Sequence, residues 1–225
     1  MTDFFHDRLM KRKSILITAI VILAILFAAA FQVYRGQTEK QAAQTAARNK
    51  EALARFHAPS VGPANARVQI VEFFDPACGT CASFYPLVKK IVEAHPADIR
   101  LSLRYAPFHP GSDEVVKMLE ASRKQGKFWP ALEALLASQP DWVQNHHARA
   151  ELAWPALARA GVDTGQVKTD MQSPEVARLV AQDMADANTL EVTQTPEYFV
   201  NGRPLPSVGF EQLRTLVDEE LAATR

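Results

Sequence analysis

The sequence has few cysteines and no excess of either charge. Its 225 residues include two cysteines, 25 basic and 25 acidic side chains, so the formal net charge at pH 7 is zero. Two cysteines are too few for a small domain built around disulfides, and a neutral chain offers no overall electrostatic attraction for nucleic acid. Apolar residues make up 48% of the chain, which is enough for one globular domain with a sizeable core, alone or with an appendage.

One long apolar run near the N-terminus predicts a membrane anchor. Only Thr18 is polar within residues 15–31, and three basic residues precede the run at 11–13. A helix that spans a bilayer needs about 20 apolar residues, with a lower limit of about 17. We therefore predict a cytoplasmic N-terminus at residues 1–13 and a transmembrane anchor at residues 14–34.

A signal sequence, cleaved or uncleaved, is the alternative interpretation of this run. Three alanines at residues 28–30 lie near the end of the run, and small residues are typical of a cleavage site. An anchor and a signal would both export the rest of the chain. A buried core helix fits less well, because no polar residues divide the run into two faces.

The segment after the run has the composition of a helical linker. Residues 35–58 are rich in Ala, Gln, Glu, Lys and Arg and contain no proline, which favours a helix. We expect a solvated spacer in preference to a coiled coil between chains, because alanines would bury too little area. Two prolines and a glycine in residues 59–63 then mark a boundary, and we expect the folded domain to occupy residues 59–225.

The pattern of apolar residues in this domain predicts an α/β fold. The expected elements are, in order, a strand at residues 68–74, a helix at 78–94, a strand at 99–105, helices over 112–188, a hairpin at 197–205 and a helix at 210–221. The first three elements form a βαβ unit with parallel strands. A helical insertion, at about residues 108–190, therefore separates the second strand from the third.

Both cysteines lie where the first strand leads into its helix, in the motif Cys78-Gly79-Thr80-Cys81. A sulfur at a helix N-terminus meets free N–H groups and the positive end of the helix dipole, which favour the thiolate. Cys78 is therefore the predicted nucleophile. Cys81 lies one turn further on and can attack a mixed disulfide held on Cys78, so the pair can act as a redox centre without another cofactor.

Alternative roles for the cysteine pair are weaker. A zinc or copper site would need further ligands, and the sequence has no second Cys or His pair at the usual spacing. An inert disulfide would close so small a loop that it would gain little stability. Haem attachment needs a histidine directly after the second cysteine, and Ala82 stands there. We predict no metal at this site, and a protein that binds copper through both thiolates is the alternative of a different class.

The sequence resembles the thioredoxin superfamily and, more closely, its DsbA-like branch of exported thiol-disulfide oxidoreductases. The resemblance is carried by residues 71–74 ahead of the Cys-x-x-Cys motif, and by residues 195–202 (TPEYFVNG). It covers about residues 60–225 and implies a thioredoxin fold with a helical insertion. It also implies that Pro196 follows a cis peptide bond beside the cysteines, and that Thr195 presents its backbone to the substrate.

Acidic residues precede the motif in the sequence. Glu72 lies inside the first strand, where the family often has a buried acid; burial would raise its pKa and suit it to move the proton of Cys81. An exposed carboxylate at the strand end is the alternative. Asp75 would oppose a thiolate on Cys78, but we expect Asp75 to be exposed. We interpret His109 as a loop histidine.

The resemblance predicts an extracytoplasmic enzyme that exchanges disulfides with polypeptides, with an oxidase preferred to an isomerase or reductase. Gly79 and Thr80 replace the Pro-His of strongly oxidising members. The loss of that histidine weakens the stabilisation of the Cys78 thiolate, so the pair should be less oxidising than the strongest oxidant, at about −120 mV. Thr195 also occurs before the proline in isomerase-like relatives, which keeps the alternatives open.

The partners and the location follow from the same interpretation. The predicted substrates are reduced or misoxidised polypeptides, and a membrane protein is expected to reset the cysteine pair. No nucleic acid is expected. The predicted location is the bacterial inner membrane, with a single span and the C-terminal domain in the periplasm.

Overall fold

The structure is a computed structural model that describes residues 3–223, with side chains from residue 20 onward except those of residues 48 and 51. The side chains of the predicted cytoplasmic segment, residues 1–13, therefore lie outside the described residues. The chain divides into two compact units, Met1–Thr45 and Ala46–Arg225.

Helix α1 (Asp3–Leu53) contains the predicted anchor and most of the predicted linker. Its part Ile20–Ala47 is long and apolar enough to cross a membrane. Large apolar side chains such as Leu23 and Phe27 are exposed there, as a lipid-facing surface requires. This part is a candidate membrane anchor; a signal sequence near the N-terminus would meet the same criteria of length and composition.

A mixed sheet forms the centre of the second unit, with its strands in the order β1-β3-β2-β6-β7. The strands are β1 (Ser60–Val61), β2 (Val68–Phe74), β3 (Ile99–Tyr105), β6 (Glu197–Val200) and β7 (Arg203–Pro204). β2 and β3 are parallel, from Val68 opposite Ile99 to Phe74 opposite Tyr105, and β6 runs antiparallel to β2. Every residue of β2 except Gln69 is buried, which explains its nearly continuous apolar sequence.

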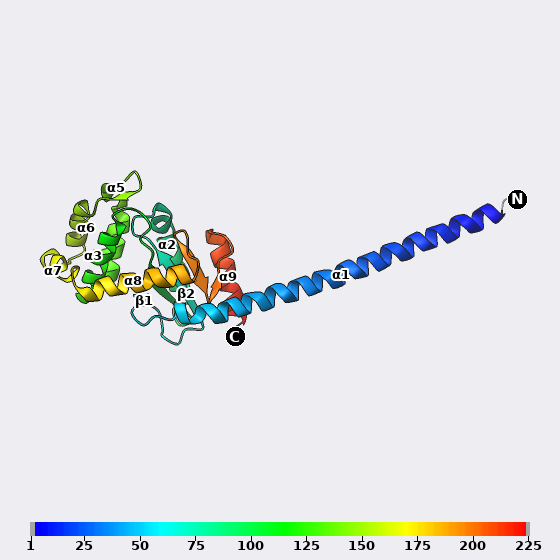
Figure 1. Ribbon diagram of the computed structural model, residues 1–225, viewed down its shortest axis with the longest axis horizontal. Coiled ribbons are helices and arrows are strands. Elements are labelled where there is room, and N and C mark those ends of the chain that lie inside the picture. The colour runs from blue at the N-terminus through cyan, green and yellow to red at the C-terminus, as the bar shows by residue number, and fades with distance from the viewer. Residues whose placement is uncertain (1–2, 224–225) are drawn as a thin grey trace. The chain divides into compact units, whose positions relative to one another are not determined.

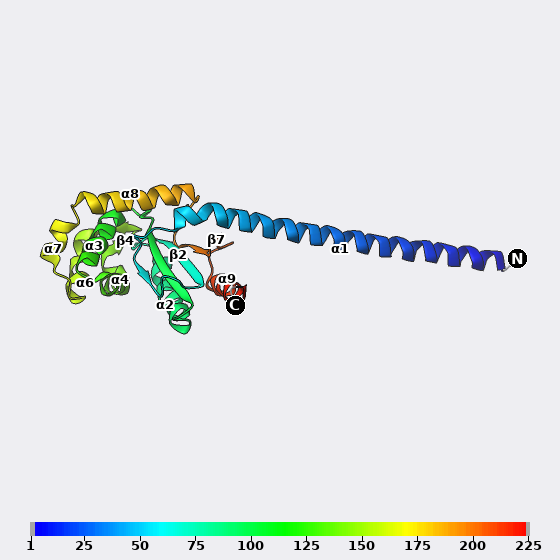
Figure 2. The same cartoon turned by 90° about the horizontal axis from the view of Figure 1, so that it is seen from below.

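The helices form two groups. α2 (Gly79–Ala94) connects β2 to β3, and α9 (Phe210–Ala223) ends the chain. Between β3 and β6 lie α3 (Ser112–Lys124), α4 (Phe128–Ala137), α5 (Gln139–Trp142), β4 (Val143–Gln144), β5 (His147–Ala148), a 3-10 turn (Ala150–Leu152), α6 (Trp154–Arg159), α7 (Thr164–Asp170) and α8 (Pro174–Thr189). The predicted insertion between the second and third strands of the pattern is confirmed. Figures 1 and 2 show α8 running from the insertion helices toward the sheet.

The end of α1 and the chain just after it pack on the sheet. The second compact unit starts at Ala46, so it takes in the last part of the segment expected to be a solvated linker. Leu53 is 7% exposed and belongs to an apolar cluster with Val71 and Phe73 of β2 and Ala187 of α8. Residues 46–58 are therefore part of the folded unit.

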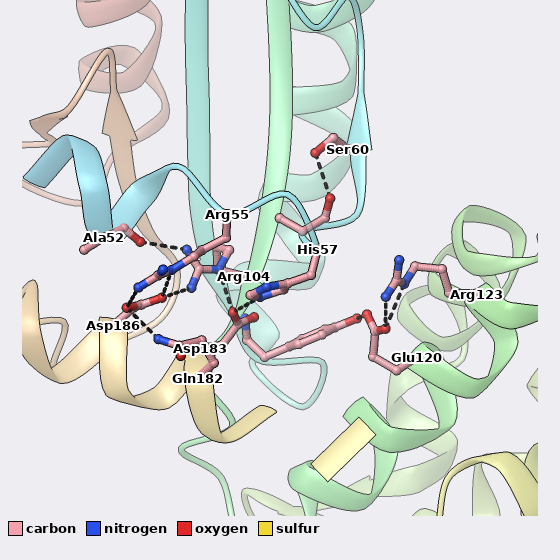
Figure 3. A network of polar contacts seen from close by, with 12 residues as sticks. Ala52, Arg55, His57, Ser60, Arg104, Glu120, Arg123, Gln182, Asp183 and Asp186 are labelled. Carbon is pink, nitrogen blue, oxygen red and sulfur yellow. Dashed lines mark hydrogen bonds and ion pairs between the residues drawn. The ribbon is translucent and has the colours of Figure 1, made fainter. Parts of the chain in front are cut away.

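A buried ionic network holds this segment in place (Figure 3). Arg104, at the end of β3, is fully buried and donates hydrogen bonds to Asp183 Oδ1 at 2.7 Å, to Ala52 O at 2.9 Å and to Asp186. Arg55 also pairs with Asp186, its Nη2 lying 2.6 Å from Oδ1. The network ties α8, β3 and the end of α1 together.

Candidate active site

Cys78 is the N-cap residue of α2, directly after the turn that follows β2. The backbone N–H of Cys81 donates a hydrogen bond to Cys78 Sγ at 3.4 Å, and Cys78 Sγ lies 3.2 Å from the carbonyl oxygen of Thr195. The side chain of Cys81, helped by the N–H groups of Cys81 and Thr80, lowers the pKa of Cys78 from 9.0 to about 5, against the opposing effect of burial. Cys78 is therefore a thiolate at neutral pH.

Cys81 lies in the opposite environment. It is 1% exposed, and burial, followed by its hydrogen bond with Cys78, raises its pKa well above the ordinary value of 9.0. Both cysteines are free thiols. The motif thus combines an ionised sulfur on Cys78, which is 6% exposed, with a protonated sulfur on Cys81, which is more deeply buried. This arrangement suits stepwise disulfide exchange.

Glu72 lies on β2 opposite Tyr198 of β6. Glu72 is 2% exposed, so the alternative of an exposed carboxylate is wrong. Burial raises its pKa to about 8, and the charge of Glu72 in turn contributes to the raised pKa of Cys81. Glu72 Oε2 and the Tyr198 hydroxyl are buried without a hydrogen-bond partner among the described residues. These groups form a polar cluster behind the buried thiol.

Asp75 is fully buried, so the expectation that it is exposed is wrong. Its Oδ1 accepts a hydrogen bond from the Ala77 N–H at 2.8 Å. Its Oδ2 accepts one from the backbone N–H of His109 at 2.8 Å and lies 2.8 Å from His109 Nδ1. The carboxylate is buried because it satisfies the N–H groups of the turn. His109 is therefore more than a loop histidine, since it supports the turn before Cys78.

The peptide bond between Thr195 and Pro196 is cis, as the family resemblance implies. This bond precedes β6 and leaves the Thr195 carbonyl beside Cys78 Sγ. Gly79 and Thr80 are exposed at the start of α2. The structure thus brings Thr195, from the second sequence stretch, into contact with the Cys78 sulfur of the first.

Comparisons with known proteins agree with this geometry. A family model described as Thioredoxin matches residues 56–219. The chain belongs to the thioredoxin family. A thioredoxin-like oxidoreductase from Silicibacter pomeroyi DSS-3 shares 31% sequence identity and superposes with a TM-score of 0.66, covering 76% of this chain and 97% of that one. The predicted thioredoxin fold is confirmed, and the DsbA-like proteins of known structure share it.

More distant similarities concern the fold or only part of a relative. The thiol-disulfide exchange protein alpha-DsbA2 from Wolbachia pipientis has the same fold, with 18% identity, a TM-score of 0.68 and coverage of 81% of this chain and 97% of that one. The Na(+)/H(+) antiporter NhaA from Herminiimonas arsenicoxydans is 31% identical over 144 residues, which are 64% of this chain. The chain spans only 22% of that antiporter's length.

One residue that contacts the active-site turn was not predicted from the sequence. Gln139, at the start of α5, donates hydrogen bonds from Nε2 to Pro76 O at 2.8 Å and to Cys78 O at 3.1 Å. No local motif marks this glutamine, because its partners are backbone carbonyls far away in the sequence.

Among the residues with described side chains, no group of three His, Cys, Asp or Glu side chains is placed to hold a metal ion.

Proposed function

We propose that this protein exchanges disulfides with polypeptide substrates outside the cytoplasm, with Cys78 as the nucleophile and Cys81 as the resolving thiol. The observation that carries the proposal is the opposite ionisation of the two sulfurs. The pKa of Cys78 is lowered to about 5, whereas that of the buried Cys81 is raised. A thiolate on Cys78 stabilises the reduced form of the pair, which favours the oxidase direction over reduction or isomerisation.

In the oxidase direction the protein starts with a disulfide between Cys78 and Cys81. A substrate thiolate attacks Cys78 Sγ, the Cys78–Cys81 bond breaks, and Cys81 leaves as a thiolate that takes up a proton. A second substrate thiolate then attacks the substrate sulfur of the mixed disulfide and releases the Cys78 thiolate. Two electrons pass from the substrate thiols to the cysteine pair, and the substrate gains one disulfide.

Glu72 is proposed to supply the proton that Cys81 takes up. Its carboxyl group is buried, and because its pKa is raised to about 8 it is protonated at neutral pH. An acid with a pKa near the working pH can both donate and recover a proton. In the reverse direction the Glu72 carboxylate would remove the proton from Cys81.

Thr195 and Pro196 are proposed to bind the substrate backbone next to the nucleophile. The cis bond places the Thr195 carbonyl 3.2 Å from Cys78 Sγ. Gly79 and Thr80 are exposed next to Cys78, which is itself 6% exposed, so an extended peptide would reach the sulfur from the side of these two residues. Contacts with backbone alone would allow many polypeptide sequences.

The proposed location is the inner membrane, with Ile20–Ala47 contributing the anchor and the thioredoxin domain in the periplasm. The basic residues before the apolar run support this orientation. A membrane protein that accepts the two electrons from Cys78 and Cys81 is proposed to reset the pair. A thiol reagent that does not cross membranes should label Cys78 in cells whose outer membrane has been opened, and labelling only after lysis would contradict this orientation.

The catalytic proposal is tested with the full chain in detergent and a reduced client protein whose activity requires its disulfides. Wild-type protein is expected to restore client activity, Cys78→Ser to abolish this effect, and Cys81→Ser to accumulate a mixed disulfide between Cys78 and the client. Oxidation that persists in Cys78→Ser would overturn the proposal. Stoichiometric copper on the purified protein, lost in both cysteine variants and without client oxidation, would favour the copper-binding alternative.

A further inference from the structure

The turn before the nucleophile is held from two sides. On one side, Asp75 accepts the N–H of Ala77 through its carboxylate at 2.8 Å and the N–H of Cys78 through its backbone oxygen at 3.0 Å. On the other side, the Gln139 amide donates to the carbonyls of Pro76 and Cys78. The N–H groups of residues 77 and 78 and the carbonyls on either side of Ala77 are thus fixed by hydrogen bonds.

Gln139 itself is held firmly in the helical insertion. It is 9% exposed and begins α5, the helix that ends at Trp142. Trp142 is fully buried, and its indole N–H donates to Leu135 O of α4 at 3.0 Å. A side chain anchored in this way loses little conformational freedom when it binds the turn, so its hydrogen bonds act on the turn rather than on a mobile loop.

We propose that Gln139 is a positioning residue through which the helical insertion sets the stability of the Cys78 thiolate. This inference rests on the proposed function, in which Cys78 is the nucleophile. Its bonds to Pro76 O and Cys78 O fix the backbone on both sides of Ala77 and so direct Cys78 Sγ toward the Cys81 N–H. A weaker contact between Sγ and that N–H leaves the thiolate less stabilised and the pair less oxidising.

The test compares two glutamines in the full chain. Gln139→Met keeps the length of the side chain and removes the donor. Gln125→Met is the matched control, because Gln125 also bridges backbone groups of the insertion, with Nε2 3.0 Å from Asp163 O and Oε1 2.9 Å from Asp163 N, but these partners lie outside the turn. The readouts are the thiolate absorbance of Cys78 against pH and the equilibrium of the cysteine pair with glutathione.

We expect Gln139→Met to raise the pKa of Cys78 by about half a unit to one unit and to shift the glutathione equilibrium about fivefold toward the protein disulfide. Gln139→Glu should shift both further in the same direction, because its carboxylate replaces the donor and adds negative charge near the sulfur. Gln125→Met should leave both values at the wild-type level. Circular dichroism of each variant reports whether the fold is retained.

The outcomes separate this inference from the proposed function. If wild-type Cys78 titrates at about 5 and both Gln139 variants match it, the positioning role is wrong and the nucleophile stands. If Gln125→Met shifts the values as much as Gln139→Met, the effect is a general loosening of the insertion and the inference is also wrong. If wild-type Cys78 titrates near its ordinary pKa, the proposed function and this inference fail together.

Discussion

At the residue scale, the two sulfurs of the motif ionise in different pH ranges, so the redox potential of the pair should depend on pH with two different slopes. The pKa of Cys78 is about 5 and that of Cys81 lies well above 9.0. Reduction of the disulfide therefore takes up two protons below about pH 5 and one proton above it. We expect the potential to fall by about 59 mV per pH unit below about pH 5 and by about 30 mV per unit at neutral pH. Equilibration with a thiol buffer over this range measures both slopes.

The stability of the reduced protein should follow the same ionisation. The pKa of Cys78 is lower in the folded state than in the unfolded chain, so its thiolate stabilises the fold fully above about pH 9. That contribution decreases as the pH falls and is gone below about pH 5. Cys78→Ser lacks this dependence and serves as the control.

The redox potential gives the outcome that would contradict both predictions. If the potential fell by about 59 mV per pH unit through neutral pH, Cys78 would be an ordinary thiol.

Glu72 gives a second prediction, of opposite sign. Its pKa is raised by burial to about 8, so it destabilises the fold increasingly as the pH rises from about 4.5 to about 8 and the unfolded chain ionises first. Glu72→Gln lacks this ionisable group. We expect the free energy of unfolding of the variant, relative to that of wild type, to rise by about 3 kcal/mol between pH 5 and pH 8. Urea unfolding of the oxidised protein measures this difference.

The control and a kinetic readout complete the Glu72 test. Glu93→Gln removes an exposed acid from α2 and should show no such pH-dependent gain. Because Glu72 is the proposed proton donor to Cys81 as Cys81 leaves, Glu72→Gln should also slow the formation of the mixed disulfide with the substrate about tenfold or more. A variant that gains no stability at pH 8 would indicate that Glu72 is ionised in the folded protein.

Single residues of the site differ in how far the sequence could reveal them. The burial of Glu72 could be predicted, because a strand that is apolar on both sides of a polar residue carries that residue into the interior with it. Asp75 is buried against expectation, because Asp75-Pro76 has the composition of an exposed turn, and its partner His109 comes from the loop after β3. The role of Gln139 could not be predicted from the sequence, because every residue has a backbone carbonyl and the identity of the acceptor residue therefore does not indicate the bond.

At the element scale, apolar periodicity predicted the sheet better than the insertion. The predicted strands at residues 68–74 and 99–105 coincide with β2 and β3, and the final helix begins at Phe210 as expected. Inside the insertion the sequence predicted helix but not the short β4–β5 hairpin. A strand of two residues is too short to give a periodic signal, and its backbone turns at Asn145 and His146 with positive φ.

The buried ionic network between α8 and β3 leads to a prediction about stability. Asp183 is fully buried and bonds Arg104 Nε at 2.7 Å, the Tyr105 N–H at 2.9 Å and His57 Nε2 at 2.6 Å. Asp183→Asn removes one of the two charges that compensate the buried Arg104, and we expect a loss of about 3 kcal/mol in the free energy of unfolding. Asp218→Asn, at an exposed position of α9, should stay within about 0.5 kcal/mol of wild type. Equal effects from the two variants would contradict the role of the network.

At the scale of the whole molecule, the start of the folded unit could not be predicted from composition. Prolines and a glycine mark a boundary at residues 59–63, but the compact unit begins at Ala46. The difference arises because the segment before the prolines consists of polar residues and alanines apart from Leu53 and Phe56. Among its described side chains, only Leu53 is large, apolar and buried. Arg55 and His57 of this segment bind acids on α8, more than a hundred residues later in the chain, and sequence periodicity does not report such pairs.

The two possible starts predict different stabilities for shortened chains. A chain of residues 46–225 keeps the network and should unfold at the same urea concentration as the full chain. A chain of residues 59–225 lacks Leu53, Arg55 and His57. This uncovers part of the apolar cluster and removes the contacts of Arg55 and His57 with the buried carboxylates of α8. We expect it to lose about 3 kcal/mol or more in the free energy of unfolding. The thiolate titration of Cys78 should be the same in both chains, because the buried contacts of the segment are with α8, β2 and β3 rather than with the motif. Equal stability of the two chains would show that the segment is a spacer after all, and a changed titration would show that it reaches the active site.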